Sequence, residues 1–301
     1  MNVNKFKTIY LSVLIPITVI VCIVSLGYRV YTFSREVGEY VSESNWGGVV
    51  KEFFADLGSS VNSNVKIGVN GGSWGDPVME EYDNLEFTNM DIDLAFANIK
   101  IKEGDAFKVT TEYSAELLPE VKVVGDTLTV KHDSKNYSIQ INGKSMKCDV
   151  TIIVPKGTVL GEVTINTDLG NVEIKDELHF SNIDITASLG NIEIDSATAE
   201  KLEIEAKLGN VEIKDGDITT INIQADLGDV TLRDTRFDTG VINDDLGEID
   251  VKGEFGSLTA GCDLGDVKVD CDNLSSAKMD LDTDLGSVKV NGKKHGSSYK
   301  Q

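Results

Sequence analysis

The dipeptide Leu-Gly recurs seven times at nearly even spacing, and this repeat constrains the fold of the 301-residue chain more than any other feature. Successive copies are 18 to 21 residues apart. A period of this size, kept over many copies, is typical of repeat proteins in which each unit buries its apolar face against its neighbours. The copies lie at 169–170, 189–190, 208–209, 227–228, 246–247, 264–265 and 285–286.

Apolar columns accompany the repeat. When the seven copies are aligned on the leucine, apolar residues also fill the positions six and four before it and three and five after it. With the leucine these are 35 positions, and only Gly240 is not apolar, whereas the overall hydrophobic fraction of 41% predicts about 14. Alternation with a period of two indicates strands with one buried face. The glycine is predicted to lie where a side chain would clash, and to turn the chain between two short strands.

These columns predict an all-β fold, a β-solenoid similar to a single-stranded β-helix, with about seven coils of 19–20 residues over 161–292. An antiparallel sandwich has turn signals at similar spacing, but it would not keep identical columns through seven copies. Two residues before each leucine, small residues predict a tight inward corner. Asp244 breaks that column and Gly240 breaks its own, so the fifth coil is predicted to be irregular.

Irregular strand patterns precede the repeats and predict a β cap over 85–160. Residues 293–301 are expected to be a polar tail, and 29–84 a juxtamembrane stalk with a Gly/Ser/Asn-rich linker. A short basic segment, 1–7, opens the chain.

Residues 8–28 form an uncharged apolar run that predicts one transmembrane helix. A cleaved signal peptide is the rival interpretation, but the run exceeds the usual signal core and Arg29 follows it directly, so a retained anchor is expected. A slight excess of positive charge before the run favours a cytoplasmic amino end and a large extracellular domain. The expected localisation is the cell membrane, with a single pass.

The chain carries a net charge of −22, which argues against nucleic acid as a partner because phosphate binding needs clustered Lys and Arg. Directly before the leucine, aspartate stacks on four consecutive coils. A bound cation would relieve their repulsion, but aspartate is also favoured in solvated turns, and we predict no metal site there. Asn171, Asn191 and Asn210 are predicted to form a stacked amide ladder. The four aspartates are Asp226, Asp245, Asp263 and Asp284.

No pattern of catalytic residues emerges from the sequence. The three histidines are scattered, and Gly143-Lys144-Ser145 lacks the earlier glycine of a phosphate-binding loop. We therefore predict no enzyme activity, no catalytic, cofactor-binding or metal-binding residues, and no cofactor. The cysteines outside the predicted membrane helix are expected to be free thiols, with Cys271 in a polar turn. The histidines are His132, His179 and His295, and the cysteines are Cys148, Cys262 and Cys271.

Two segments carry a resemblance to a known family. The strand VTIIVPKG at 150–157 and the repeat TINTDLGNVEI at 164–174 resemble the bacterial putative-adhesin family of β-strand repeat proteins, a domain of unknown function. The resemblance covers about 85–292. It implies a β-repeat fold, often behind one membrane helix, in a family common in Gram-positive bacteria and in some cases linked to envelope-stress operons. It implies no catalytic residues.

The function predicted from the sequence is that of a membrane-anchored extracytoplasmic β-solenoid that acts by binding, as an adhesin or a cell-envelope-associated module. The expected partners are the membrane, through the N-terminal helix, and a cell-wall polymer or membrane protein; the oligomeric state stays open. One alternative is a calcium-binding or polysaccharide-processing β-helix. Another is a scaffold that faces the cytoplasm.

Overall fold

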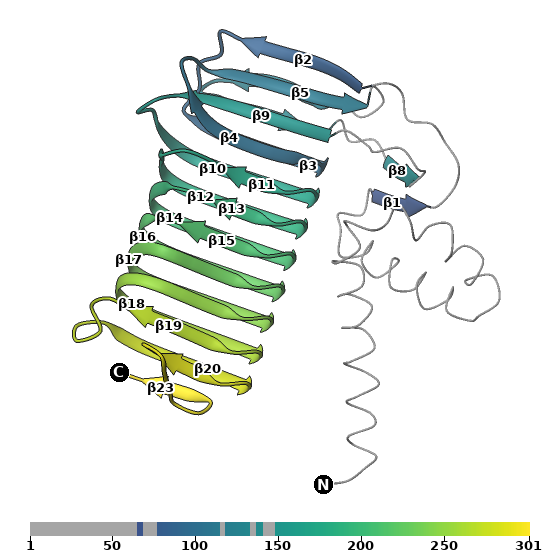
Figure 1. Cartoon of the computed structure of the whole chain (residues 1–301). Helices are drawn as coiled ribbons and strands as arrows, with labels where there is room; N and C mark the ends of the chain where they lie inside the picture. Colours follow the sequence, from purple (N-terminus) through teal and green to yellow (C-terminus); the bar gives the residue numbers. More distant parts are fainter. Residues whose placement is uncertain (1–64, 69–76, 115–117, 133–136, 141–147) are drawn as a thin grey trace, which may run out of the picture.

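A computed structural model describes residues 65–68, 77–114, 118–132, 137–140 and 148–301. The predicted transmembrane helix at 8–28 lies outside these residues. In the part of the chain that is described, no helix is both long and apolar enough to span a membrane. The Leu-Gly repeats stack one on another as a rod of parallel strands, so the prediction of an all-β solenoid with about seven coils is confirmed (Figure 1).

Each coil consists of a long strand that ends at the leucine and a short strand that begins after the glycine. In the middle of the rod, β17 and β18 combine the short strand of one coil with the long strand of the next. The long strands are β10 (Val159–Leu169), β12 (Leu178–Leu189), β14 (Ala197–Leu208), β16 (Asp217–Leu227), β17 (Val230–Leu246), β18 (Ile249–Leu264) and β20 (Lys278–Leu285). The separate short strands are β11 (Val172–Ile174), β13 (Ile192–Ile194), β15 (Val211–Lys214), β19 (Val267–Cys271) and β21 (Val288–Val290).

The coils stack in register, leucine on leucine, which is why the sequence columns repeat. Leu169 pairs with Leu189 and Leu189 with Leu208. Alternate residues of each strand are buried, as Ile183 and Ile185 are in β12. The core is therefore a continuous stack of aliphatic side chains along the axis of the rod.

The leucine column itself departs from the prediction that it is buried. Six of the leucines are half-buried, and Leu285 is 68% exposed. The last inward position of each long strand is instead two residues earlier, where the predicted column of small residues is buried in all seven coils. Because the chain turns directly after the leucine, that side chain lies at the corner between two faces.

The glycine of the repeat has the predicted steric role. A Cβ added at Gly209 would lie 2.0 Å from the carbonyl oxygen of Gly190 in the preceding coil. Gly209 also has a φ of +145°, which side-chain-bearing residues rarely adopt. The glycine thus lets adjacent coils approach closely at this corner.

The region 85–160 continues the stack further than an irregular cap would. β3 (Asn89–Phe96) and β4 (Asn98–Gly104) pair in register with β10 and β11, with Phe96 in the place of the leucine. β7 (Thr127–Lys131) and β9 (Cys148–Pro155) stack on them in turn. β5 (Lys108–Ser114) and β6 (Glu120–Val124) then pair antiparallel with β9 and β7.

The two ends of the rod are closed by antiparallel strands. β2 (Pro77–Asp83) pairs with β5, although 29–84 was expected to be a stalk and linker. β22 (Lys293–Lys294) and β23 (Ser298–Lys300) pair with β21 and β20, where a polar tail was expected. Such strands cover the edges of a parallel stack, which otherwise invite pairing with other chains. β1 (Val65–Gly68) and β8 (Tyr137–Gln140) form a separate two-stranded sheet.

The irregularity predicted for the fifth coil has a packing cause. A Cβ at Gly240 would lie 2.7 Å from the ring of Phe237. That ring stacks on Phe255 of the next coil, with centroids 5.0 Å apart and an interplanar angle of 8°. Gly240 therefore leaves the space that the aromatic pair occupies.

Candidate functional surfaces

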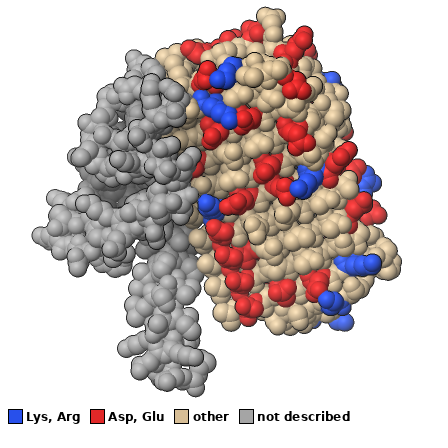
Figure 2. Space-filling model, turned by 180° about the vertical axis from the view of Figure 1, so that it is seen from behind, with Lys and Arg blue, Asp and Glu red and all other residues tan. Residues whose placement is uncertain are grey.

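The Leu-Gly corner carries the predicted aspartate row along one edge of the rod. Figure 2 shows acidic side chains running along this edge over the lower coils, where Asp226, Asp245, Asp263 and Asp284 follow one another in the stack. Burial and the neighbouring Asp245 raise the pKa of Asp226, and Lys207 opposes the effect. Among the described residues, no three His, Cys, Asp or Glu side chains are arranged to hold a metal ion.

The predicted asparagine ladder is present, but its hydrogen bonds run from backbone to side chain. The Asn191 N–H donates to Asn171 Oδ1 at 2.9 Å, and the Asn210 N–H donates to Asn191 Oδ1 at 2.9 Å. The ladder begins at Asn98 in β4 and continues past the asparagines: the Asp229 N–H donates to Asn210 Oδ1 at 3.0 Å, and the Glu248 N–H donates to Asp229 Oδ1 at 3.0 Å. At the corner this backbone N–H does not bond to a backbone carbonyl of the neighbouring strand. The side-chain oxygen of the preceding coil accepts its hydrogen bond instead.

We predict that Asn191→Ala lowers the stability of the rod by about 1 kcal/mol, because the Asn210 N–H loses its acceptor. Urea denaturation of the purified chain measures this difference. Asn222→Ala is the matched control: Asn222 is exposed, and its side chain makes no hydrogen bond to the described part of the chain. Equal losses from both substitutions would contradict a stabilising ladder.

Asp244 is the one acidic residue in the buried column of small residues. It is 2% exposed, its Oδ1 accepts a hydrogen bond from the Leu246 N–H at 3.2 Å, and its Oδ2 has no hydrogen-bond partner among the described residues. Burial raises the pKa of Asp244 to about 7; the Leu246 N–H opposes this and Asp229 adds to it.

The equivalent residues in the next two coils show what the Asp244 position requires. Thr283 Oγ1 donates to the carbonyl oxygen of Gly265 at 2.8 Å, and Cys262 Sγ donates to that of Gly247 at 3.4 Å. The corresponding carbonyl for Asp244 is that of Gly228. A Cβ built at Gly247 would lie 2.0 Å from the Gly228 oxygen and 2.5 Å from Asp244 Oδ2, so both oxygens surround one point. A carboxyl group there can donate a hydrogen bond only when it is protonated.

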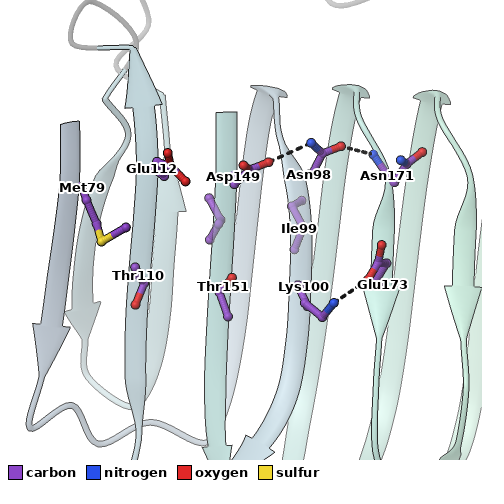
Figure 3. A pocket seen from close by; sticks show the side chains of 11 residues that line it. Met79, Asn98, Ile99, Lys100, Thr110, Glu112, Asp149, Thr151, Asn171 and Glu173 are labelled. Atoms are coloured by element: carbon purple, nitrogen blue, oxygen red, sulfur yellow. Dashed lines mark hydrogen bonds and ion pairs between the residues drawn. The ribbon is translucent and has the colours of Figure 1, made fainter. Parts of the chain in front are cut away.

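A polar groove of about 470 Å³ lies near the N-terminal end of the rod, between β2 and β11. Figure 3 shows its side chains, several of which are paired with one another. Lys100 Nζ is 2.8 Å from Glu173 Oε2, and Asn98 Nδ2 donates to Asp149 Oδ1 at 2.8 Å. Met79 at the rim is 61% exposed. The first pair bridges β4 and β11 and the second bridges β4 and β9, so each joins neighbouring strands of the stack.

The histidines lie at separate places in the fold: His132 follows β7, His179 is in β12, and His295 lies between β22 and β23. His132 Nδ1 accepts a hydrogen bond from the Ala95 N–H at 3.1 Å, and His295 packs on the ring of Tyr299. The segment Gly143-Lys144-Ser145 lies outside the described residues.

The three described cysteines are free thiols, as predicted, and all are buried. Burial raises the pKa of Cys148 to about 12 and that of Cys262 to about 11. Cys271 is 3% exposed at the end of β19, so its expected place in a polar turn is wrong. The alternation of β19 continues to this residue and directs its side chain inward.

One surface does not follow from the apolar columns of the sequence, because it is defined by what its residues lack. On the long-strand face of the fourth, fifth and sixth coils, three outward positions per coil carry no charge. Its signal in the sequence lies in the polar columns of the repeat rather than in the apolar ones. The nine residues, termed here the uncharged face, are Thr220, Asn222, Gln224, Thr239, Val241, Asn243, Ser257, Thr259 and Gly261.

A solved structure shows the same fold. A putative adhesin from Bacteroides fragilis matches with a TM-score of 0.54 and 21% identity, covering 71% of this chain and 97% of its own. A putative lipid binding protein from Parabacteroides distasonis matches with a TM-score of 0.46 and 14% identity, over 75% of this chain and 98% of its own. No curated protein gives a significant match.

The family model described as Toastrack DUF4097 matches residues 87–301. This range contains every Leu-Gly coil and the two strands, β3 and β4, that stack on the first of them. The resemblance to a putative-adhesin family of unknown function is thereby confirmed. The chain belongs to the Toastrack DUF4097 family.

Proposed function

We propose that the protein is a membrane-anchored, extracytoplasmic binding module, adhesin-like or associated with the cell envelope, and not an enzyme. The observation that carries the proposal is the construction of the rod itself. Successive coils place their outward-facing residues in register. These residues therefore form long, continuous surfaces along the rod rather than a single cleft. The solved structure of the same fold that is described as a putative adhesin supports this interpretation.

The anchor and its orientation come from the sequence. Residues 8–28 carry no charge over a length that suits the hydrocarbon core as a helix. Lys5 and Lys7 precede the run, together with the free amino group, and Arg29 and Arg35 follow it. This balance favours export of the solenoid.

Capture from envelope fractions tests the proposed binding. The purified full chain, held in detergent and immobilised through its C-terminus, is incubated with solubilised cell-wall polymers and membrane proteins from its source. We expect specific retention of envelope material, absent from a column that carries heat-unfolded protein. Failure to retain anything above that control would contradict a binding role.

A further inference from the structure

The uncharged face is bounded by charged rows on two sides. In the coil before it, Lys201, Glu203 and Glu205 pair with its first row. In the coil after it, Lys278, Asp280 and Asp282 pair with its last row. Figure 2 shows this area as a tan surface between charged rows, with the acidic edge along one side. Since 26% of all residues are charged, nine average positions would include about two charges.

The side chains of this face have unused hydrogen-bonding capacity. The amides of Asn222, Gln224 and Asn243 are exposed and make no hydrogen bonds within the described residues. One side-chain bond forms inside the face, from Ser257 Oγ to Thr239 Oγ1 at 3.4 Å. Amides and hydroxyls both donate and accept, so the face can pair with a ligand that presents both kinds of group.

The centre of the face is apolar and stiff. Val241 is half-buried there, between Asn222 of one neighbouring coil and Thr259 of the other. The face is rich in β-branched Thr and Val, whose side chains have few rotamers to lose when a ligand binds. An apolar patch surrounded by amides and hydroxyls suits a ligand that has both hydroxyl groups and C–H surfaces.

The size of the face argues against a protein partner. Three coils about 4.8 Å apart, and five residues at about 3.3 Å each, give an area of roughly 240 Å². A stable protein interface buries about 800 Å² on each partner. A second copy would therefore have to extend over the charged rows and the acidic edge, where like charges would meet. A narrow, uncharged chain avoids this repulsion.

We propose that the uncharged face binds a neutral polysaccharide chain. The inference rests on the proposed function as a binding module, for which it names a site and a ligand class. Sugar hydroxyls supply donors and acceptors to the exposed amides and hydroxyls, while the C–H face of a sugar ring packs on Val241. No ion pair forms, so the affinity does not fall as salt is added.

The test uses three insoluble neutral polysaccharides as probes: cellulose, chitin and a β-1,3-glucan. The full chain in detergent is sedimented with each at low and at high salt, and the bound fraction is measured. We expect retention on at least one polysaccharide, equal at both salt concentrations. Thr259→Lys, which places a long charged side chain in the middle column of the face, should weaken this binding at least tenfold.

Thr164→Lys is the matched control, because Thr164 occupies the same outward column in the first coil, outside the face. It should bind like the wild type, and circular dichroism should show that both variants are folded. Three outcomes would overturn the proposal: no retention on any of the three probes, equal binding by Thr259→Lys and the wild type, or a wild-type dimer that Thr259→Lys converts to monomers. If envelope capture succeeds while these probes fail, the binding module stands and this face is wrong. If envelope capture also fails, the proposed function itself is contradicted.

Discussion

Gly209→Ala should destabilise the solenoid by about 4 kcal/mol or more, which is the range reached when a substitution forces atoms into occupied space. The added Cβ would lie 2.0 Å from the carbonyl oxygen of Gly190, and 2.6 Å from its carbonyl carbon. Both atoms belong to the backbone of the preceding coil, so no side-chain rotation relieves the contact. The coils must separate or shift. Thermal unfolding monitored by circular dichroism measures the loss.

Gly125→Ala separates this steric effect from the conformational preference of glycine. Gly125 has a φ of +66° in the turn between β6 and β7, and a Cβ there would meet nothing within 4 Å. Only the left-handed backbone is penalised, at about 1–2 kcal/mol. Equal destabilisation by the two substitutions would show that close stacking at the Leu-Gly corner is not what the repeat glycine provides.

Asp244→Asn should stabilise the protein above pH 7 and remove the fall in stability that Asp244 causes between about pH 4 and pH 7. The folded state raises the pKa of Asp244 from 3.8 to about 7, chiefly through burial. The folded state therefore holds a proton that the unfolded state releases, and the stability of the wild type falls as the pH rises through this range. One pKa unit corresponds to about 1.4 kcal/mol, so the loss is on the order of 4 kcal/mol.

The measurement is the melting temperature of the wild type and of Asp244→Asn at pH 5 and pH 8. The asparagine amide can donate to the Gly228 carbonyl without a titrating proton, as Thr283 donates to that of Gly265. Asp245→Asn is the control, because it removes a charge from the adjacent exposed position and should keep the pH dependence. We expect the melting temperature of the wild type to fall relative to that of Asp244→Asn between pH 5 and pH 8. If the difference between the two proteins is the same at both pH values, Asp244 is not protonated in the native state.

The coils could be predicted from the sequence because in-register stacking makes each buried column repeat along the chain. The same logic failed where the stack continues without the dipeptide. Phe96 and Ala97 take the places of leucine and glycine in the coil of β3 and β4. Between that coil and β10 the chain forms β5 to β9, of which β7 and β9 stack on β3 and β4, while β5 and β6 pair antiparallel with β9 and β7. These additional strands interrupt the period of 18 to 21 residues, so the sequence pattern does not repeat there. The prediction that the leucine is buried was wrong for a different reason. Alternation with a period of two does not show where a corner interrupts the strand.

The surfaces were less predictable than the core. The asparagine ladder could be predicted because identical residues recur at one position, but its backbone donors emerge only when the corner geometry is known. The sequence shows that Asp244 breaks its column. It does not show that Cys262 and Thr283 of this column each donate to a glycine carbonyl of the preceding coil, which an ionised Asp244 cannot do. The uncharged face combines three columns from three coils, and it becomes a single surface only after stacking.

Protease shaving of intact cells tests most directly whether the solenoid is presented outside the membrane. The full chain is produced in a Gram-positive host with an epitope tag after Gln301, because a tag remains cleavable where a stacked rod resists proteolysis. A cytoplasmic protein with the same tag reports whether the cells stay intact. Proteins held outside the membrane lose the tag in intact and lysed cells alike, and this is the expected result for the solenoid. Loss of the tag only after lysis would place the domain in the cytoplasm and contradict an extracytoplasmic binding module.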